Sequence, residues 1–279
     1  MVPTVSRPNP AADARLLDEL TAVAVRAAAA VTALAPHELA VRTKSDHSPV
    51  TAADEAAEAL ILESLARLLP GVPVVSEEAA AGARPAALPS LFVLVDPLDG
   101  TREFIAGRPE FTVNIALVAD ASPVMGVVAA PGLRRLWRGL VGHGAERIAL
   151  AAEAPAPGAP TGIRTRSAPP AGLVAAISRS HPDAATLSFL DRLPVAERTV
   201  LGSSAKFCRV AEGAADVYPR LSPISEWDIA AGHAVLAAAG GTVVGADGGP
   251  LAYGRVQQEF RVPAFVAWGD AEAARRYRV

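Results

Sequence analysis

Apolar residues recur at helical spacing in two segments of the first third of the chain. The leucines and alanines of 51–69 follow the 3.6-residue period of an amphipathic helix. We predict helices over 12–35 and 51–69, because Pro36 ends the first pattern and Pro70 ends the second. Continuous apolar runs predict strands over 72–75, 91–95, 111–118, 123–130 and 136–141.

The second half of the chain alternates between short strands and helices. The patterns predict strands over 173–177, 195–200, 217–221, 242–244 and 264–268, and helices over 182–193, 203–214 and 226–239. Such elements bury their apolar faces by packing helices on sheets, which predicts an α+β or α/β fold in layers. We expect an N-terminal α+β lobe over 1–148 and a C-terminal α/β lobe over 172–279. The segment 149–171, rich in Ala, Pro and Gly, is the predicted connection, and 79–90 is a predicted surface loop.

The composition excludes several classes of binding partner and cellular location. The 279 residues carry a net charge of −3, so no basic field attracts a nucleic acid polymer. The single Cys208 excludes an internal disulfide and fits a reducing compartment. No apolar run has the length of a membrane span, and residues 1–10 lack the pattern of a signal peptide. We therefore expect a cytoplasmic protein, and its oligomeric state stays open, with a homodimer as one alternative.

One turn carries the strongest chemical signal. Asp96 and Asp99 follow the apolar strand 91–95 directly, with Gly100 and the hydroxyl of Thr101 behind them. Two carboxylates this close repel each other unless a cation lies between them, and oxygen ligands suit a hard ion such as Mg²⁺. The alternative is ordinary turn chemistry, since Asp-Pro and Asp-Gly are common turn formers. The combination favours a metal–phosphate site.

Three further acids fall at the ends of predicted elements. Asp54 and Asp228 each lie three residues after a hydroxyl residue, Thr51 and Ser225, which is also the spacing of a helix capping box. Glu77 follows a predicted strand, where a solvated surface charge is the alternative. Spacing alone does not choose between capping and ligation, and one carboxylate can do both.

Taken together, these segments resemble the lithium-sensitive, magnesium-dependent phosphatases of the inositol monophosphatase superfamily. The matching segments are 48–54 (SPVTAAD), 75–78 (VSEE), 96–104 (DPLDGTREF), 111–116 (FTVNIA) and 227–232 (WDIAAG). Within the superfamily the chain is most similar to the CysQ-type 3′(2′),5′-bisphosphate nucleotidases, through 178–181 (SRSH), 202–207 (GSSAKF) and 217–220 (VYPR). The resemblance implies a layered αβαβα sandwich with the metals between two lobes.

The resemblance also implies the roles of individual residues. Glu77, Asp96 and the carbonyl of Leu98 would hold one Mg²⁺, and Asp96, Asp99 and Asp228 a second. Asp54 would serve a third, weaker ion or its water, and Thr101, with Asp54 or Glu77, would orient the attacking water. Because metal ions neutralise phosphoryl oxygens and lower the pKa of bound water, we expect attack by that water in line with the leaving group. No phosphoenzyme is expected, because no nucleophile in an anion-binding loop is evident.

Substrate choice needs other groups. By the resemblance, Lys206 and Arg220 would bind a second phosphate, Ser203 would add a hydroxyl donor, and His181 would stack on adenine. Gly100 and the backbone N–H groups after it would approach the transferred phosphate. The expected substrate is a phosphorylated small molecule, adenosine 3′,5′-bisphosphate, with 3′-phosphoadenylyl sulfate as a second, which implies a place in sulfate assimilation.

Two alternatives remain at this stage. The same site could act on an inositol phosphate or on fructose 1,6-bisphosphate, because relatives overlap in substrate. The scaffold could also be a non-catalytic regulator that binds metal or nucleotide, although all the expected ligands and Thr101 are present.

Overall fold

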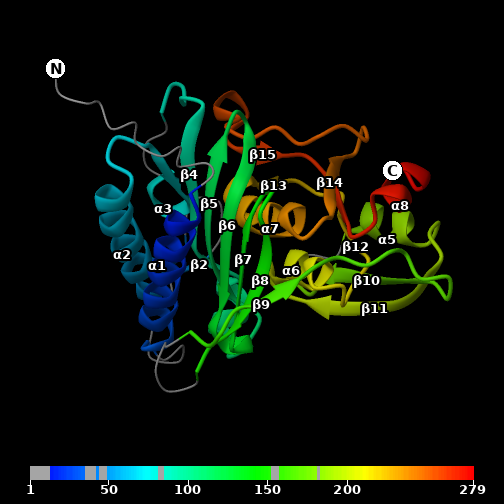
Figure 1. Cartoon of the computed structure of the whole chain (residues 1–279), viewed down its shortest axis with the longest axis horizontal. Helices are drawn as coiled ribbons and strands as arrows, with labels where there is room; N and C mark the ends of the chain where they lie inside the picture. The colour runs from blue at the N-terminus through cyan, green and yellow to red at the C-terminus, as the bar shows by residue number, and fades with distance from the viewer. Residues whose placement is uncertain (1–12, 35–41, 44–48, 81–84, 152–156, 181–182) are drawn as a thin grey trace.

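The computed structural model describes residues 13–34, 42–43, 49–80, 85–151, 157–180 and 183–279. Two long helices, α1 (Ala14–Thr32) and α2 (Ala52–Leu68), form its first layer (Figure 1). Their apolar stripes, which include Leu20 and Ile61, are fully buried against the neighbouring sheet. Both predicted helices are therefore present, each slightly shorter than its apolar pattern.

A seven-stranded sheet forms the second layer. Its strands lie side by side in the order in which the chain visits them, and only the first pair, β3 and β4, is parallel. The strands are β3 (Val74–Ser76), β4 (Leu91–Asp99), β5 (Thr112–Ala119), β6 (Ser122–Ala130), β7 (Arg135–Leu140), β8 (Gly144–Ala149) and β9 (Thr161–Ile163). The sequence pattern missed β8, which is short and carries charges. It also placed the residues of β9 in the connecting segment, although β9 extends this sheet by pairing with β8.

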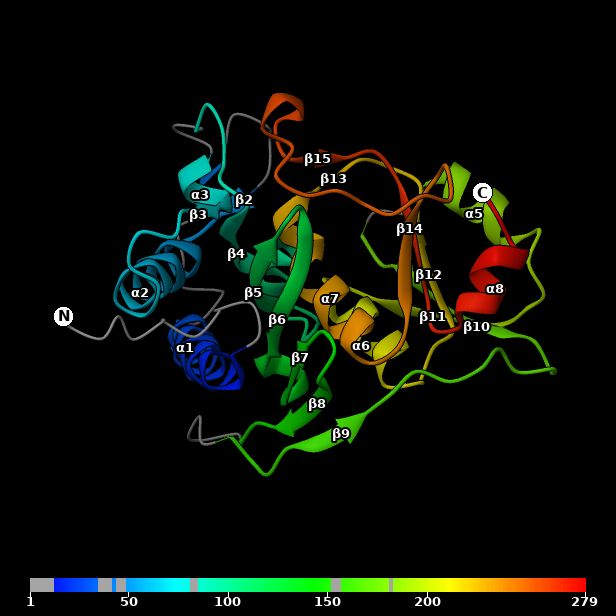
Figure 2. The same cartoon turned by 45° about the horizontal axis from the view of Figure 1, so that its top comes forward.

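Two helices, α6 (Ala205–Ala211) and α7 (Glu226–Ala238), form the middle layer between two sheets (Figure 2). On one side α7 lies directly on β6 and β7. Gly139 of β7 permits this close approach, since a Cβ atom at that position would stand only 2.9 Å from Val235 Cα. On the other side a Cβ atom at Gly232 would stand 2.7 Å from the Phe207 ring of α6. Small residues thus set the spacing of this layer.

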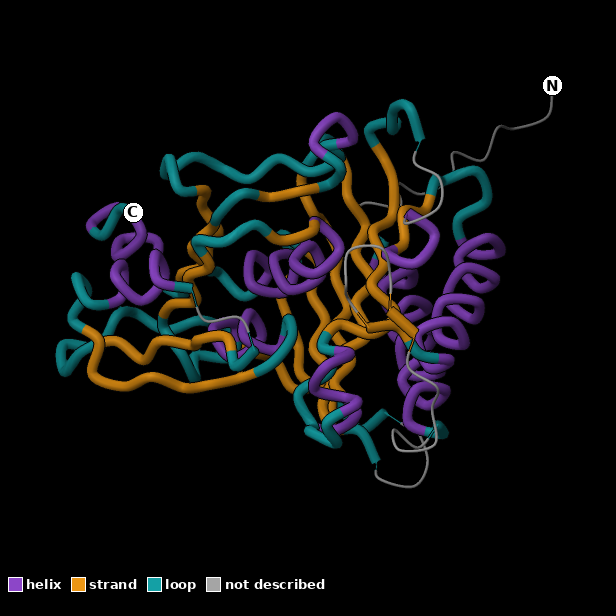
Figure 3. The backbone as a smooth tube through the Cα atoms, turned by 180° about the vertical axis from the view of Figure 1, so that it is seen from behind, coloured by secondary structure: helices purple, strands orange, loops and turns teal. Residues whose placement is uncertain are grey.

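A five-stranded mixed sheet follows, with the strand order β11-β10-β12-β16-β14. Its strands are β10 (Leu173–Ser178), β11 (Val195–Leu201), β12 (Val217–Arg220), β14 (Thr242–Gly245) and β16 (Phe265–Trp268). Helices α5 (Ala184–Leu190) and α8 (Ala271–Arg276) cover its outer face around Phe189 and Trp268. The view from behind shows the same alternation of helix and strand layers (Figure 3). The predicted αβαβα sandwich is confirmed.

Short elements join these layers near the candidate site. They are β1 (Arg42–Thr43), β2 (Pro49–Val50), α3 (Glu77–Ala80), α4 (Thr101–Ile105), β13 (Ile224–Ser225), a 3₁₀ turn (Val256–Gln258) and β15 (Arg261–Val262). Strand β13 pairs with β15 outside both main sheets. Among the helices that the structure describes, none has the length and apolar character needed to cross a membrane.

Candidate active site and metal centre

An irregularity in β4 places two acids on one face of the sheet. Asp96 is opposite Asn114 of β5, and after a shift in register Asp99 is opposite Thr112. Asn114 and Thr112 are two residues apart, so they share a face, and their cross-strand partners share it too. The strand is longer than the predicted 91–95, because the ladder continues past Pro97 to Asp99 through this bulge.

Gly100 then turns the chain into α4. Its φ of +89° is in the left-handed region that glycine adopts without strain. A Cβ atom there would stand 3.1 Å from the carbonyl oxygen of Glu110, so the neighbouring backbone also packs closely. The turn therefore needs this glycine for both its conformation and its packing, and it brings Thr101 to the start of α4.

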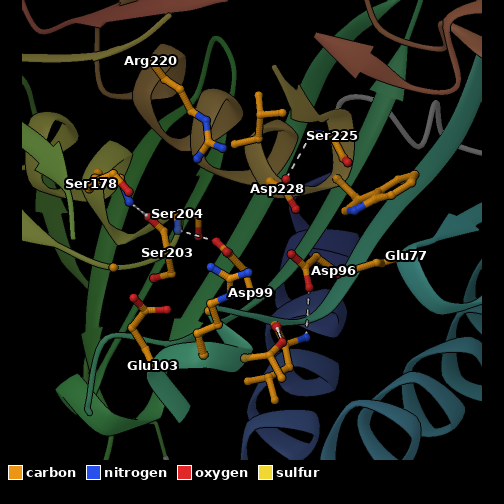
Figure 4. A pocket seen from close by; sticks show the side chains of 18 of the residues that line it. Glu77, Asp96, Asp99, Glu103, Ser178, Ser203, Ser204, Arg220, Ser225 and Asp228 are labelled. Atoms are coloured by element: carbon orange, nitrogen blue, oxygen red, sulfur yellow. Dashed lines mark hydrogen bonds between the residues drawn. The ribbon is translucent and has the colours of Figure 1, made fainter. Parts of the chain in front are cut away.

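Three carboxylates from three separate elements meet in front of β4. Oxygen atoms of Glu77, Asp96 and Asp228 all lie within 4.8 Å of one another (Figure 4). Glu77 is the first residue of α3, directly after β3, the parallel neighbour of β4. Asp228 lies in the first turn of α7, where its Oδ2 accepts the backbone N–H of Ser225 at 3.1 Å. The capping box predicted for Asp228 is present, and the same side chain joins the acidic cluster.

Burial and mutual repulsion perturb these acids. Burial, followed by the charges of Glu77, Asp99 and Asp228, raises the pKa of Asp96 well above its usual range. Burial, with Asp99 and Glu77 nearby, raises the pKa of Asp228 to about 8. Burial also raises the pKa of Asp99 to about 6, although Lys206 and the Ser204 N–H act in the opposite direction. Such a set of acids is stable in its charged form only with cations among them.

The donor set fits a hard divalent cation. All the side-chain donors are carboxylate oxygens, the ligands that Mg²⁺ prefers. Asp96 Oδ1 accepts the backbone N–H of Leu98 at 3.0 Å, but its buried Oδ2 has no hydrogen-bond partner among the described residues. A buried acceptor without a partner is costly, and a bound cation would satisfy it. Leu98 and Asp99 line the same cavity.

Asp54 lies behind this cluster and reaches it through Thr101. Its Oδ2 accepts both the backbone N–H (2.9 Å) and the hydroxyl (2.7 Å) of Thr51, which completes the predicted capping box. The Thr101 hydroxyl lies 3.4 Å from Asp54 Oδ1 and 3.0 Å from the carbonyl oxygen of Leu98. Asp54 is absent from the described residues that line the cavity, so the five acids do not all share one pocket surface: four line it, and the fifth is one hydroxyl away.

The cavity extends from the acids toward three groups from the second half of the chain. Its volume is about 360 Å³, within the usual range for small-molecule sites. Ser203, Lys206 and Arg220, all predicted from the sequence, line it. His181 lies outside the described residues.

Lys206 and Arg220 are held differently. Lys206 is buried, with its Nζ 2.5 Å from the carbonyl oxygen of Ser203 and over the ring of Tyr218. Burial lowers the pKa of Lys206 to about 8, although Asp99 raises it. Arg220 makes a long hydrogen bond, 3.5 Å, to the carbonyl oxygen of Pro223 and also interacts with the Tyr218 hydroxyl, while its buried Nε has no partner among the described residues. Arg220 is thus the cation with more donors left for an anion.

The sequence reasoning missed several residues of the cavity wall. Ser204 donates its backbone N–H to Asp99 Oδ2 at 2.5 Å. Glu103, buried on α4, lines the cavity and accepts a hydrogen bond from the Ser180 hydroxyl. The other wall residues not predicted as site residues are Arg102, Ser178, Gly202, Tyr218, Pro223, Ile224, Ser225, Trp227 and Arg261. Most of them lie in the matching segments. Ser225 lies outside these segments and was marked only by its capping-box spacing to Asp228, and no sequence signal marks Pro223, Ile224 and Arg261.

Comparison with known proteins agrees with this arrangement. The profile of the inositol monophosphatase family matches residues 14–274. The chain belongs to this family. It is 46% identical over 225 residues to the 3′(2′),5′-bisphosphate nucleotidase CysQ of Escherichia coli K12, which covers 81% of this chain and 87% of that protein.

Solved structures of the family are similar over most of the chain. The crystal structure of CysQ from Bacteroides thetaiotaomicron, a bacterial member of the inositol monophosphatase family, matches with a TM-score of 0.74 and 33% identity, covering 91% of this chain and 97% of the other. The inositol monophosphatase of Anabaena matches with a TM-score of 0.70 and 27% identity, covering 94% of each chain. The predicted family and its CysQ-type branch are confirmed, and the protein is a phosphatase of this family.

Proposed function

We propose that this chain is a metal-dependent phosphomonoesterase that removes the 3′-phosphate of adenosine 3′,5′-bisphosphate and acts also on 3′-phosphoadenylyl sulfate. The observation that carries the proposal is that one cavity is lined both by a cluster of acids and by two cations. Glu77, Asp96 and Asp228 form the acidic end, and Lys206 and Arg220 line the cavity beside it. A substrate with two anionic groups and a neutral sugar between them is complementary to that pattern. The 46% identity to CysQ of Escherichia coli supports the same choice.

The acidic end is the place for two Mg²⁺ ions, with a third near Asp54. Glu77, Asp96 and the Leu98 carbonyl would hold the first, and Asp96, Asp99 and Asp228 the second. When bound, the ions would neutralise phosphoryl oxygens and lower the pKa of a coordinated water. The orphaned Oδ2 of Asp96 and the raised pKa values of its neighbours support this assignment.

The remaining residues position the reactants. Thr101 has one hydroxyl proton and two acceptors, Asp54 and the Leu98 carbonyl, so its lone pair is free to accept a hydrogen bond from a water in the cavity. Asp54 is held in place by hydrogen bonds from the Thr51 backbone N–H and hydroxyl. It orients the Thr101 hydroxyl and can accept the proton that the attacking water loses. Arg220 and Lys206 hold the second phosphate, and Ser203 and His181 contact the rest of the nucleotide. These groups raise the reaction rate because they position the reactants and stabilise the negative charge of the phosphate groups.

A substrate comparison tests the proposal. Purified protein with Mg²⁺ is given adenosine 3′,5′-bisphosphate, inositol 1-phosphate and fructose 1,6-bisphosphate at the same low concentration, and phosphate release is measured. We expect the highest kcat/KM for the bisphosphonucleotide, with adenosine 5′-monophosphate as the product. Equal or better turnover of either sugar phosphate would refute the substrate assignment, and no Mg²⁺-dependent release from any of them would favour a non-catalytic role. Family behaviour implies inhibition by Li⁺ at millimolar order.

The cytoplasm remains the proposed location. Cys208, the only cysteine of the chain, is buried and unpaired, which fits a compartment where disulfides do not form.

A further inference from the structure

The start of α7 needs a restraint that the acidic cluster does not supply. Asp228 comes from a different layer of the fold than Asp96, yet their oxygens lie within 4.8 Å of each other. Like charges at this separation push the two elements apart. Contacts elsewhere must therefore hold the first turn of α7 against β4.

Glu226 supplies the most direct of these contacts. The side chain is fully buried, two residues before Asp228, and no ion pair of it is present among the described residues. Its two oxygens accept separate backbone donors: Oε2 accepts Gly254 N–H at 2.7 Å and Oε1 accepts Arg255 N–H at 2.8 Å. Its own N–H donates to the carbonyl oxygen of Phe260 at 2.8 Å. One residue thus binds three points of the segment 253–262, which we call the strap.

The strap continues along the other side of the helix start. Ser225 of β13 is opposite Arg261 of β15, and Ile224 is opposite Val262. The Arg261 guanidinium also donates to the Ser225 hydroxyl at 3.0 Å. Since the Ser225 N–H donates to Asp228 Oδ2, the strap reaches the carboxylate through one intervening residue.

The first residues of the strap rest on the seven-stranded sheet. Tyr253 N–H donates to the carbonyl oxygen of Ala121, in the turn between β5 and β6, at 3.0 Å. A Cβ atom at Gly254 would stand 3.2 Å from the Phe92 ring, and Phe92 belongs to β4, the strand of Asp96. The Tyr253 hydroxyl also bonds His233 Nδ1 of α7 at 2.9 Å. The strap therefore contacts both elements whose acids repel each other; its strand β15 is labelled in Figure 1.

We propose that Glu226 is a positioning residue for the metal site, which through the strap fixes the separation of Asp228 from Asp96. The inference rests on the proposed function, because it concerns the same carboxylates as metal ligands. Glu226 itself is not among the described residues that line the cavity. Its effect passes through the backbone of Gly254 and Arg255.

The test compares two isosteric substitutions in the full chain. Glu226→Gln replaces one acceptor with an amide NH₂, which leaves one strap N–H facing a donor. Asp216→Asn is the matched control: Asp216 is also buried and accepts a backbone N–H, from Val174 at 2.7 Å, but it pairs with Arg166 away from the site. Binding of Mn²⁺ without substrate is measured by the loss of its free-ion electron paramagnetic resonance signal, and Tm is measured in parallel.

We expect Glu226→Gln to weaken Mn²⁺ binding about tenfold, the usual size of an effect from a group that orients a ligand. The Mg²⁺ concentration for half-maximal activity should rise by the same factor, with kcat recovered at saturating Mg²⁺. Asp216→Asn should lower Tm and leave Mn²⁺ binding within twofold of the wild type. Should Glu226→Gln fail to fold, Tyr253→Phe removes only the bond to His233 and should weaken Mn²⁺ binding in the same direction.

Three results separate the possible failures. Wild-type Mn²⁺ binding in a folded Glu226→Gln protein would overturn the inference, as would unchanged binding in Tyr253→Phe if the first variant does not fold. Equal weakening in Asp216→Asn would show that general stability, not positioning, controls the metal. Absence of Mn²⁺ binding by the wild type would instead refute the proposed function.

Discussion

Replacing Asp96 with Asn should abolish activity and yet stabilise the metal-free protein. The change is isosteric: Asn Oδ1 can still accept the Leu98 N–H, and the NH₂ takes the position of the unpartnered Oδ2. It removes one of three carboxylates whose oxygens lie within 4.8 Å of one another, and Asp96 is the buried one. At that separation, with an effective dielectric constant of 20, two unit charges repel by about 3.5 kcal/mol.

Protonation already relieves part of this repulsion in the metal-free protein, since the pKa of Asp96 is raised. We therefore expect a gain of about 2 kcal/mol at pH 8, which corresponds to a rise in Tm of about 4–8 °C for a chain of this size. Activity should fall by at least about a thousandfold, as expected when a residue shared by two metal ions loses its charge.

Thermal unfolding at pH 8 in EDTA and in excess Mg²⁺, together with phosphate release, checks both expectations. In the wild type Mg²⁺ should raise Tm, and in Asp96→Asn this increase should be lost. Asp120→Asn, which removes a charge from an exposed turn, is the control and should change neither quantity by more than the error. A destabilised metal-free Asp96→Asn protein, or one with near-normal activity, would refute the reasoning.

Three further predictions use the same assays. The pKa of Asp99 is raised to about 6 and that of Asp228 to about 8, so the folded metal-free protein binds more protons than the unfolded chain between about pH 4 and pH 8. The stability of the metal-free protein should therefore fall as pH rises through that window. For the same reason Mg²⁺ should raise Tm more at pH 8 than at pH 6. A flat Tm profile in EDTA would contradict this. Arg220→Met should raise KM for adenosine 3′,5′-bisphosphate about 10–100-fold while changing turnover of inositol 1-phosphate less than about threefold, as steady-state kinetics would show; equal losses on both would place Arg220 outside the second-phosphate site. Gly232→Ala should destabilise the protein by about 1–3 kcal/mol in urea unfolding, because the added Cβ meets the Phe207 ring at 2.7 Å, and this outweighs the better helix propensity of Ala; a net stabilisation would show that α6 can move aside.

The layers of the fold were predictable because their apolar patterns are strong. Helices α1 and α2 follow the period of helical backbone geometry, and continuous apolar runs mark strands β4, β5 and β6. Strand β8 was missed because Glu146 and Arg147 interrupt its apolar residues, although it forms a local hairpin with β7. The strap was missed for another reason, because its hydrogen bonds to Glu226 join residues that no local pattern connects.

Asp96 and Asp99 were singled out by their turn, whereas the roles of Asp54, Glu77 and Asp228 were predicted from motif resemblance and not from spacing. Asp54 and Asp228 both form the capping boxes that their spacing suggests. Asp228 also joins the acidic cluster, so its spacing to Ser225 correctly predicted the cap but did not predict the contact with Glu77 and Asp96. Gly232 packs on the side chain of Phe207. Which side chain fills such a space depends on the helix packed opposite, which sequence periodicity does not encode.

The position of the strap near the end of the chain has a consequence for synthesis on the ribosome. Translation proceeds at about 5–20 residues per second, so Asp228 emerges on the order of ten seconds after Asp96, and the strap follows it. During that interval the nascent chain exposes Glu77 and Asp96 without the helix start that completes their cluster. A nascent chain that ends between residues 229 and 252 would contain all five acids and Thr101, yet it would lack the segment that holds them together, so full competence to bind metal should be acquired only once residues 253–262 have been made.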